Sequence, residues 1–371
     1  SDLRVTVSGD VRLILADGCE LTIDGGIQVA HPNSLTIYGQ SEGNGELTAT
    51  ALPTDYNAGI GGTVYSSTGN IVINGGTVTA TGGEQGAGIG DGMADENMPV
   101  KVASITITGG TVTAKGGDQG KDRQSAAGIG GGAKTPGGKI TISGGTVTAN
   151  GADGASGIGH GGLGATGGEI TISGGTVTAT GGSGNPGISC QDAPENDRPI
   201  GEAGWILISG GTVYASPKAG EENGSAIRGS FKTGIDGDAF VVANGTGITD
   251  ETNQDAWSGV IFDGDADGKV YGSPTLKTDA KIPAGKKLTI PQGSSLTISR
   301  GKKLELTDST LTVESGATLT NNGTISGNSN SKVESNGSLG GSGTVEGDIT
   351  VPDPKDSAVS ISPSSAAYGS E

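Results

Sequence analysis

The chain has 371 residues, of which 74 are glycine, and only 3% are aromatic. Glycine does not recur at every third position, which excludes a collagen helix, and regularly spaced isoleucine and valine argue against disorder. The formal net charge of -18 disfavours nucleic acid and anionic membrane surfaces, because both are bound through clustered lysine and arginine. No apolar run reaches the ~20 residues that span a bilayer, so we expect no direct membrane insertion.

Short apolar segments recur about every eight residues near the N-terminus, as in LIL at 13–15, LTI at 21–23, IQV at 27–29 and LTI at 35–37. Segments of this kind alternate inward and outward side chains with a period of two, which is typical of β-strands. Three such segments make one short turn of the chain. Residues 1–70 are therefore predicted to form tight N-terminal coils and a cap.

A longer phrase, ITI followed by GGTV and then by Gly-Ile, recurs through residues 71–230, which we predict to form coils with long loops. Its strand signals begin, at intervals of 34, 35, 30 and 36 residues, at Ile71, Ile105, Ile140, Ile170 and Ile206. Alternation places the valine and alanine of TVTA inward and both threonines outward. A unit with one narrow apolar side cannot bury it alone, but stacked copies can pair in parallel about 4.8 Å apart.

This repeat predicts an all-β fold, a single-stranded parallel β-helix. We expect a three-sided solenoid of about ten coils, right-handed because parallel crossovers generally are. The many corners account for the glycine content, since tight corners need positive φ angles and close approach of the backbone.

The remaining ranges complete the domain organisation. Residues 231–280 are irregular, with FVVAN, VIF and KVYG as strand candidates, and are predicted to form a transition with a hairpin. The regular beat returns as LTI, LTI, LEL and LTV in residues 281–351, which are predicted to form C-terminal tight coils. Pro352 and Pro354 break the pattern, so residues 352–371 are predicted to form a linker and the start of an Ig-like module.

Phrases such as GGTVTATGG, KVYGSPTL and IPAGKKLTIPQGSSLTI resemble the repeat regions of Gly/Thr-rich parallel β-helix proteins of the bacterial cell surface, adhesin-like proteins of gut-type anaerobes. The resemblance covers nearly the whole chain. The solenoid is also similar to pectate-lyase-like and autotransporter folds, so the fold alone assigns no activity. The resemblance implies a secreted or cell-surface bacterial protein that contacts polysaccharide or the surface glycans of a host or of bacteria. We expect it to be a monomer.

The loops that vary in length flank the Gly-Ile strand of each repeat, and such variation on one side of a solenoid is typical of a binding surface. The outward positions of that strand are mostly glycine, as at Gly88 and Gly90, which predicts a flat floor walled by the loops. We expect an extended glycan to lie in this groove; the alternative is a spacer with solvated loops. The candidate ligand-binding residues are Asp91, Glu96, Arg123, His160, Glu195, Asp197, Trp205, Tyr214 and Arg228.

A calcium-assisted polysaccharide lyase or a glycoside hydrolase is the alternative function. Similarity to β-helix lyases implies a calcium shell, for which Asp91, Asp95 and Glu96 are available, with Arg123 or Arg228 as the base. The only two histidines have no nucleophile at a recognisable spacing, which argues against a hydrolase triad. No catalytic residue is assigned, and these observations favour a protein that is not an enzyme.

The segment DGDADG at 263–268 places Asp263, Asp265 and Asp267 at alternate positions, as in the first half of a calcium-binding loop. Calcium is therefore the candidate cofactor. The twelfth position is Pro274, where such a loop needs glutamate, and no helix pattern flanks it. An acidic hairpin tip is the alternative interpretation.

Outward threonine pairs recur in successive repeats and would form two ranks on a stacked sheet. They are Thr77/Thr79, Thr111/Thr113, Thr146/Thr148 and Thr176/Thr178, ending at Thr212/Tyr214. Ice-binding solenoids present similar ranks, which makes ice binding a remote alternative, although threonine also suits exposed strand positions for structural reasons. The function best supported by the sequence is a secreted or cell-surface adhesion or display module that contacts extended glycans.

Overall fold

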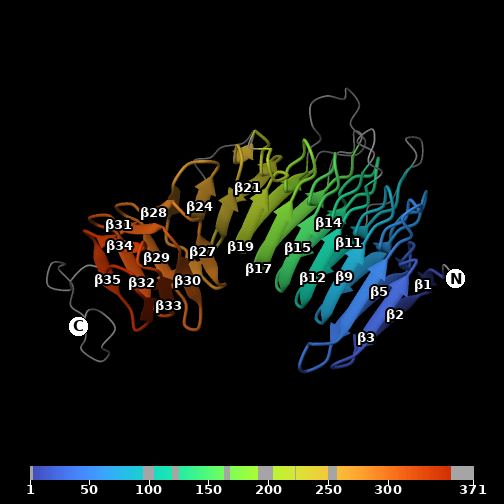
Figure 1. Cartoon of the computed structure of the whole chain (residues 1–371), viewed down its shortest axis with the longest axis horizontal. Coiled ribbons are helices and arrows are strands. Elements are labelled where there is room, and N and C mark those ends of the chain that lie inside the picture. The colour runs from blue at the N-terminus through green and yellow to red at the C-terminus, as the bar shows by residue number, and fades with distance from the viewer. Residues whose placement is uncertain are drawn as a thin grey trace.

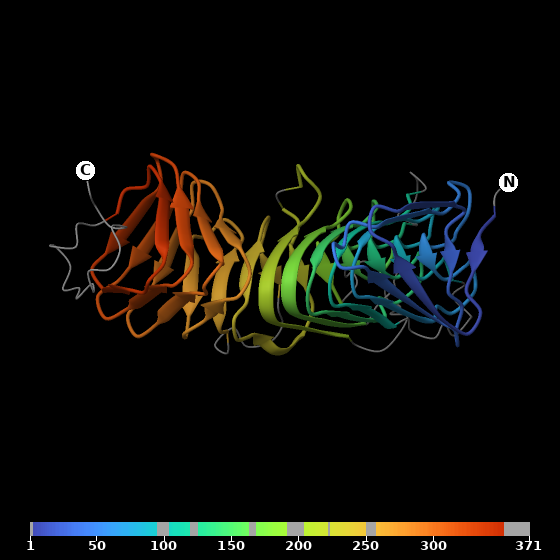
Figure 2. The ribbon, with the colours of Figure 1, turned by 90° about the horizontal axis from the view of Figure 1, so that it is seen from below.

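The computed structural model describes residues 3–94, 104–118, 125–162, 168–190, 204–221, 223–249 and 257–351. Their regular structure is β-strand, wound into an elongated parallel solenoid (Figures 1 and 2). Within these ranges no helix is long and apolar enough to cross a membrane. The predicted all-β parallel β-helix is confirmed. The predicted linker and Ig-like start at 352–371 lies outside the described residues.

The coils before the hairpin tip form the N-terminal solenoid, which has three sides. The Gly-Ile side is a sheet of two-residue strands, β1 (Val5–Thr6), β4 (Ile27–Gln28), β7 (Ile60–Gly61), β10 (Ile89–Gly90), β13 (Ile129–Gly130), β16 (Ile158–Gly159), β18 (Ile188–Ser189), β20 (Ile227–Arg228) and β23 (Ile248–Thr249). The isoleucine side contains β2 (Asp10–Leu15), β5 (Ser34–Gly39), β8 (Asn70–Ile73), β11 (Ser104–Ile107), β14 (Lys139–Ile142) and β21 (Phe231–Ile235). The threonine side contains β3 (Glu20–Asp24), β6 (Glu46–Thr50), β9 (Thr77–Thr81), β12 (Thr111–Lys115), β15 (Thr146–Asn150), β22 (Phe240–Ala243) and β24 (Gly259–Asp263). Two long strands turn the corner and belong to both of these sides, β17 (Glu169–Thr180) and β19 (Trp205–Ser216).

Alternation along each strand and stacking between strands together build the core. In β11 and β12, Ile105 and Val112 are buried, whereas Thr106 and Thr113 beside them are partly exposed. Parallel pairing in register then places Ile105 against the equivalent isoleucines of β8 and β14. Full burial of one such side chain stabilises the fold by ~1.5–3 kcal/mol, so the stacked aliphatic column is the main favourable contribution.

The C-terminal solenoid has three sides of its own. Its first side continues the large sheet with β25 (Gly268–Tyr271), β28 (Lys287–Ile290), β31 (Thr310–Val313) and β34 (Lys332–Ser335). Its second side contains β26 (Thr275–Leu276), β29 (Ser295–Ile298), β32 (Thr318–Asn321) and β35 (Ser338–Gly340). Its third side contains β27 (Ala280–Ile282), β30 (Lys303–Leu306), β33 (Thr324–Gly327) and β36 (Thr344–Gly347).

The number of coils is larger than the ten expected. The sheet of the Gly-Ile side has nine strands, and two sheets of the C-terminal solenoid have four each, counted over the described ranges. Val5 pairs with Ile27 and Ile325 with Val345, so coils near the two ends take only 22 and 20 residues. Short coils fit more turns into the same length of chain.

The two solenoids meet at an antiparallel hairpin formed by β24 and β25, which falls in the range predicted to contain one. Strand direction on the shared sheet reverses there, because β28 pairs in parallel with β25. The buried face of the sheet also changes. Val241 and Ile261 belong to the core of the N-terminal solenoid, whereas Phe262 and Val270 belong to that of the C-terminal solenoid.

These two changes cancel in their effect on handedness. A coil that reversed direction while keeping its interior on the same face of the sheet would wind with the opposite hand. Because the interior moves to the other face as well, both solenoids have the same hand. The C-terminal solenoid is therefore displaced sideways, onto the outer face of β22 and β24 (Figure 1).

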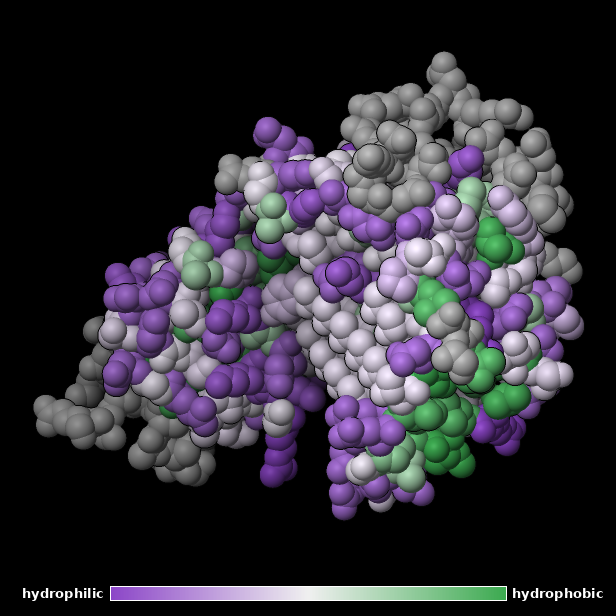
Figure 3. All heavy atoms as spheres, turned by 45° about the vertical axis from the view of Figure 1, so that its right-hand side comes forward, coloured by the Kyte–Doolittle hydropathy of each residue, from purple (hydrophilic) through white to green (hydrophobic). Residues whose placement is uncertain are grey.

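The N-terminal end of the solenoid leaves its apolar interior open. Leu3, Val5, Val11 and Leu21 are exposed large hydrophobic side chains, and they line a depression of about 570 Å³ between the strands of the first coil. This end appears as the green area in Figure 3. Beside it, the Arg4 guanidinium donates hydrogen bonds to backbone carbonyls of the following coils.

Candidate functional site

The Gly-Ile side does not form the open floor that its glycines predict. Both residues of β10, and likewise of β7, β13 and β16, are buried. Gly90 has a φ angle of 137°, and a β-carbon there would overlap the carbonyl oxygen of Gly130 in the next coil. Glycine is needed here because the coils approach each other closely. The predicted groove along this side is wrong, since a ligand cannot reach buried backbone.

Asp91 follows β10 and is 1% exposed. Neither carboxylate oxygen has a hydrogen-bond partner among the described residues, and the hydroxyl of Thr68 donates to the carbonyl of Gly90. Burial raises the pKa of Asp91 from 3.8 to about 7. The nearby Thr68 lowers this pKa, but by less than burial raises it. A carboxyl closed off from solvent cannot contact a glycan, so the prediction of Asp91 as a ligand-binding residue is wrong.

His160 follows β16 and is also buried. Its Nδ1 lies 2.8 Å from the carbonyl oxygen of Gly161, which can only accept, so Nδ1 carries a proton. Nε2 lies 3.3 Å from the hydroxyl of Ser156 and accepts a hydrogen bond from it when the ring is neutral. These bonds close the corner from within, and the prediction of His160 as a glycan ligand is wrong.

Trp205 and Tyr214 lie toward opposite ends of β19 and therefore on different sides of the solenoid. Lys232 Nζ already covers the Trp205 ring, 4.2 Å from its centroid. Arg228 is half-buried on β20, where it stands in register with Ser189. The structure does not bring these three predicted residues together in one groove.

Four further candidate ligand-binding residues lie outside the described residues: Glu96, Arg123, Glu195 and Asp197. Asp95 of the predicted calcium shell lies outside them as well. Within the part of the chain that the structure describes, no three His, Cys, Asp or Glu side chains are grouped so as to hold a metal ion.

The segment DGDADG forms the tip of the hairpin between β24 and β25. Asp263 Oδ1 accepts a hydrogen bond from the backbone of Ile248 at 2.7 Å, and Asp267 Oδ1 accepts one from the backbone of Lys287 at 2.9 Å. Asp265 offers its backbone carbonyl to a lysine ammonium group. The three carboxylates do not converge, so the predicted calcium loop is wrong and the acidic hairpin tip is the correct interpretation.

The threonine side presents straight ranks of hydroxyl groups to solvent. Parallel pairing in register forms one rank from Thr77, Thr111, Thr146 and Thr176, and the next from Thr48, Thr79, Thr113, Thr148 and Thr178. All of these side chains are partly or fully exposed. No charged residue lies within either rank. The nearest charges on this side are Glu46, in register with Thr77, and Lys115, at the next outward position of β12. We call the two ranks together the open threonine face.

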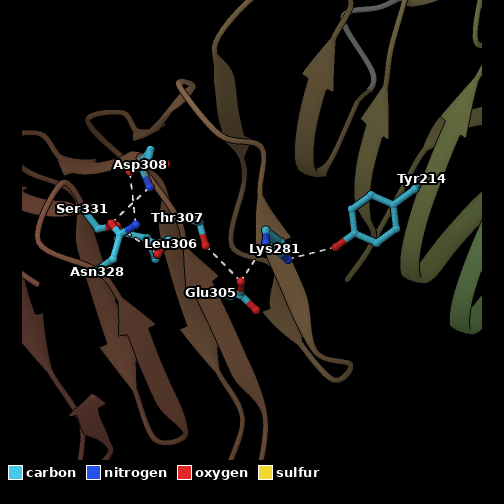
Figure 4. A network of polar contacts seen from close by, with 8 residues as sticks. All are labelled: Tyr214, Lys281, Glu305, Leu306, Thr307, Asp308, Asn328 and Ser331. Atoms are coloured by element: carbon cyan, nitrogen blue, oxygen red, sulfur yellow. Dashed lines mark hydrogen bonds and ion pairs between the residues drawn. The ribbon is translucent and has the colours of Figure 1, made fainter. Parts of the chain in front are cut away.

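The C-terminal solenoid closes one end of this face, at β19. Thr212 is fully buried there, and its Oγ1 lies 2.8 Å from Thr278 Oγ1 and 2.9 Å from the carbonyl oxygen of Asp279. The Tyr214 hydroxyl accepts a hydrogen bond from the backbone N–H of Lys281 at 2.9 Å (Figure 4). In Figure 3 a pale, weakly polar surface meets the more strongly polar flank of the C-terminal solenoid at a hollow.

The flank beside Tyr214 is held by a chain of polar contacts. Lys281 Nζ and the hydroxyl of Thr307 both reach Glu305 Oε1, at 2.8 and 3.0 Å (Figure 4). The hydrogen bond from Lys281 lowers the pKa of Glu305. At the next corner, Ser331 donates to the carbonyl of Leu306 at 2.9 Å. This flank therefore places an ion pair beside the closed end of the threonine ranks.

Sequence reasoning did not single out Thr278, Lys281 or Glu305. One signal for the closed end was present: the segments FVVA and VIF are apolar at every position rather than at alternate positions. Strands with two apolar faces are covered on both sides. Such strands following β19 indicate that another layer packs on the outer face at this point.

A family model described as "Beta helix repeat" matches residues 71–93, 105–133, 140–159 and 170–190. These segments make up well under half of the chain, and each spans an isoleucine-side strand, a threonine-side strand and a Gly-Ile strand. No curated protein and no solved structure matches the chain. Strand pairing throughout the described residues and the four matched segments agree, and the chain is a parallel β-helix repeat protein.

Proposed function

We propose that this protein is a secreted or cell-surface module for adhesion or display, and that the open threonine face contacts extended glycans. The observation that carries the proposal is the uncharged pair of hydroxyl ranks in register across β9, β12, β15 and β17. A hydroxyl both donates and accepts hydrogen bonds, which suits the many hydroxyl groups of a neutral polysaccharide. This face replaces the Gly-Ile side as the expected contact surface.

The direction of the ranks supports a polymeric ligand. Along one strand the outward threonines number two or three before the chain turns a corner. Across the coils the same residue type repeats about every 4.8 Å along the solenoid. A linear glycan lying along the solenoid axis therefore meets the same hydrogen-bonding groups at each coil.

The experiment is a glycan panel probed with the whole chain, with and without calcium. The double variant Thr113→Val, Thr148→Val removes two adjacent hydroxyls of one rank and preserves side-chain shape. The control is Thr106→Val, Thr141→Val, an adjacent register pair on the isoleucine side of the same coils. We expect at least a tenfold loss of affinity for the first variant and none for the second. Absence of any glycan binding, or an equal loss in both variants, would contradict the proposal.

Ice binding is a second candidate, favoured by the regular spacing of threonine pairs over four successive strands. It predicts thermal hysteresis in solution, reduced by Thr113→Val, Thr148→Val and unaffected by Thr106→Val, Thr141→Val. A freezing point equal to the melting point at high protein concentration removes this candidate and leaves the glycan proposal standing.

A further inference from the structure

The closed end of the threonine face shows which chemical groups its side chains bind. At β19, Thr212 and Tyr214 occupy the positions that threonine pairs hold in the preceding coils, in register with Thr176 and Thr178. The segment that covers them supplies one hydroxyl, from Thr278, and one amide carbonyl, from Asp279. It also supplies one amide N–H, from Lys281. The side chains of β19 on this face therefore form hydrogen bonds with an alcohol, with an amide carbonyl and with an amide N–H.

The adjoining rows carry uncovered hydroxyl groups at the same register positions, with threonine where β19 has Tyr214. Thr176 and Thr178 of β17, and Thr146 and Thr148 of β15, continue the ranks and remain accessible. Each hydroxyl can donate to a carbonyl or accept from an N–H, and its neighbouring γ-methyl group can contact an apolar group. The open rows can therefore make with a ligand the kinds of contact that β19 makes within the molecule.

We propose that the open threonine face selects glycans that contain N-acetylated amino sugars. This inference rests on the proposed function and specifies its ligand class. An N-acetylated amino sugar carries hydroxyls together with a secondary amide, which is the combination satisfied at β19. The amide carbonyl accepts from a threonine hydroxyl, its N–H donates to a neighbouring one, and its methyl group packs on the threonine methyls. The sugar is uncharged, as the two threonine ranks are.

The test compares two hexasaccharides, β-1,4-linked N-acetylglucosamine and β-1,4-linked glucose, by calorimetry with the whole chain. They share linkage and length and differ in the substituent at carbon 2. Each hydrogen bond gained by the amide is expected to improve affinity by roughly two- to twelvefold. We expect at least a fivefold preference for the acetylated hexamer. Thr148→Val, Thr178→Val should abolish the preference, and Thr141→Val, Thr171→Val, a register pair on the isoleucine side, should retain it.

The outcomes separate this inference from the proposal on which it rests. Equal affinity for the two hexamers, lost in Thr148→Val, Thr178→Val, overturns the acetamido preference and leaves glycan contact standing. If neither hexamer binds while other neutral glycans do, the acetamido preference is also overturned and glycan contact still stands. Absence of all glycan binding overturns both. A third arm uses a peptide that copies residues 276–283, the segment docked on β19. Binding of that peptide to the threonine face, without binding of sugars, would identify the face as a polypeptide site and overturn the inference.

Discussion

The threonine side of the N-terminal solenoid has an open half and a covered half. In the open half, β9 to β17, the first two outward residues of each threonine-side segment are threonine and face solvent. In the covered half, β22 and β24, the outward residues include Phe240 and Phe262, whose ring centroids lie 5.7 Å apart within the core of the C-terminal solenoid. Backbone pairing is parallel and in register in both halves. The sheet itself is therefore the same, and the outward side chains decide whether a surface binds a second solenoid or remains available for a ligand.

The largest effect that separates the halves is expected from Phe262→Ala. Removing a fully buried ring from the shared sheet leaves a cavity and should lower the free energy of unfolding by about 3–5 kcal/mol. Urea denaturation followed by circular dichroism measures it. The matched substitution in the open half, Thr178→Ala, should change stability by less than about 0.5 kcal/mol. Similar losses in both variants would show that the two halves do not differ in packing.

A second prediction concerns pH and the N-terminal solenoid alone. Because the pKa of Asp91 is about 7 in the folded chain and 3.8 as its ordinary value, the folded state holds a proton that the unfolded state releases in this range. The free energy of unfolding should therefore fall as pH rises from about 4 to 7, by up to about 4 kcal/mol, and then level off.

Asp91→Asn should remove this fall, so that the variant and the natural chain differ most above pH 7. Denaturation curves at pH 5, 6, 7 and 8 test the prediction. Carboxylates with lowered pKa, such as Glu305 in the C-terminal solenoid, contribute stability that is lost only as pH falls through their own folded pKa. An identical pH profile for Asp91→Asn and the natural chain would refute the assignment.

A smaller effect is expected where the two halves meet. Thr212→Val removes the hydroxyl that bonds Thr278 and leaves the Asp279 carbonyl without this donor. The expected loss is about 1–3 kcal/mol, because the site is buried. Its register partner Thr176 makes the ideal comparison, since Thr176→Val removes the same group from an accessible position. Equal stability of the two variants would mean that the contact at β19 does not hold the solenoids together.

The smallest effect is expected at the ion pair of Lys281 and Glu305, beside Tyr214. Lys281 and Glu305 form an ion pair with an Nζ to Oε1 distance of 2.8 Å, and both side chains are substantially exposed, at 48% and 40%. Glu305→Gln should change stability by less than about 1 kcal/mol, and the change should shrink further at high salt. Denaturation at two salt concentrations measures it. A large, salt-independent loss would show that the pair is part of the packed interface.

Much of the fold can be predicted from local alternation. Ile105 and Ile107 point inward and Thr106 outward because successive side chains of a strand point to opposite sides, and the repeated phrase stacks each residue on its own copy. The hairpin of β24 and β25 can be predicted from the turn residues DGDADG between the apolar segments VIF and KVYG. These features depend on neighbours within a few residues and on repetition, both of which are visible in the sequence.

The location of the accessible surface could not be predicted in this way. The sequence of the Gly-Ile side suggests an open surface, because glycine has no side chain. In the structure the missing side chain instead lets the backbones of adjacent coils pack closely together, as at Gly90 and Gly130. Asp91 reads as a surface charge and is buried by the same closure. Contacts between coils decide both outcomes, and they join residues some 30 to 40 positions apart.

The parallel β-helix, the inward and outward sets of each strand and the presence of the threonine ranks can be read from the amino-acid sequence, because each follows from a period of two and a repeated phrase. Which side is open and where the ranks end depends on packing between distant parts of the chain. Thr212 and Thr278 lie 66 residues apart along the chain and meet because the hairpin at β24 and β25 moves the core to the other face of the sheet. The apolar outer faces of β22 and β24 indicate that a layer covers them, but which segment does so depends on how the two solenoids pack against each other.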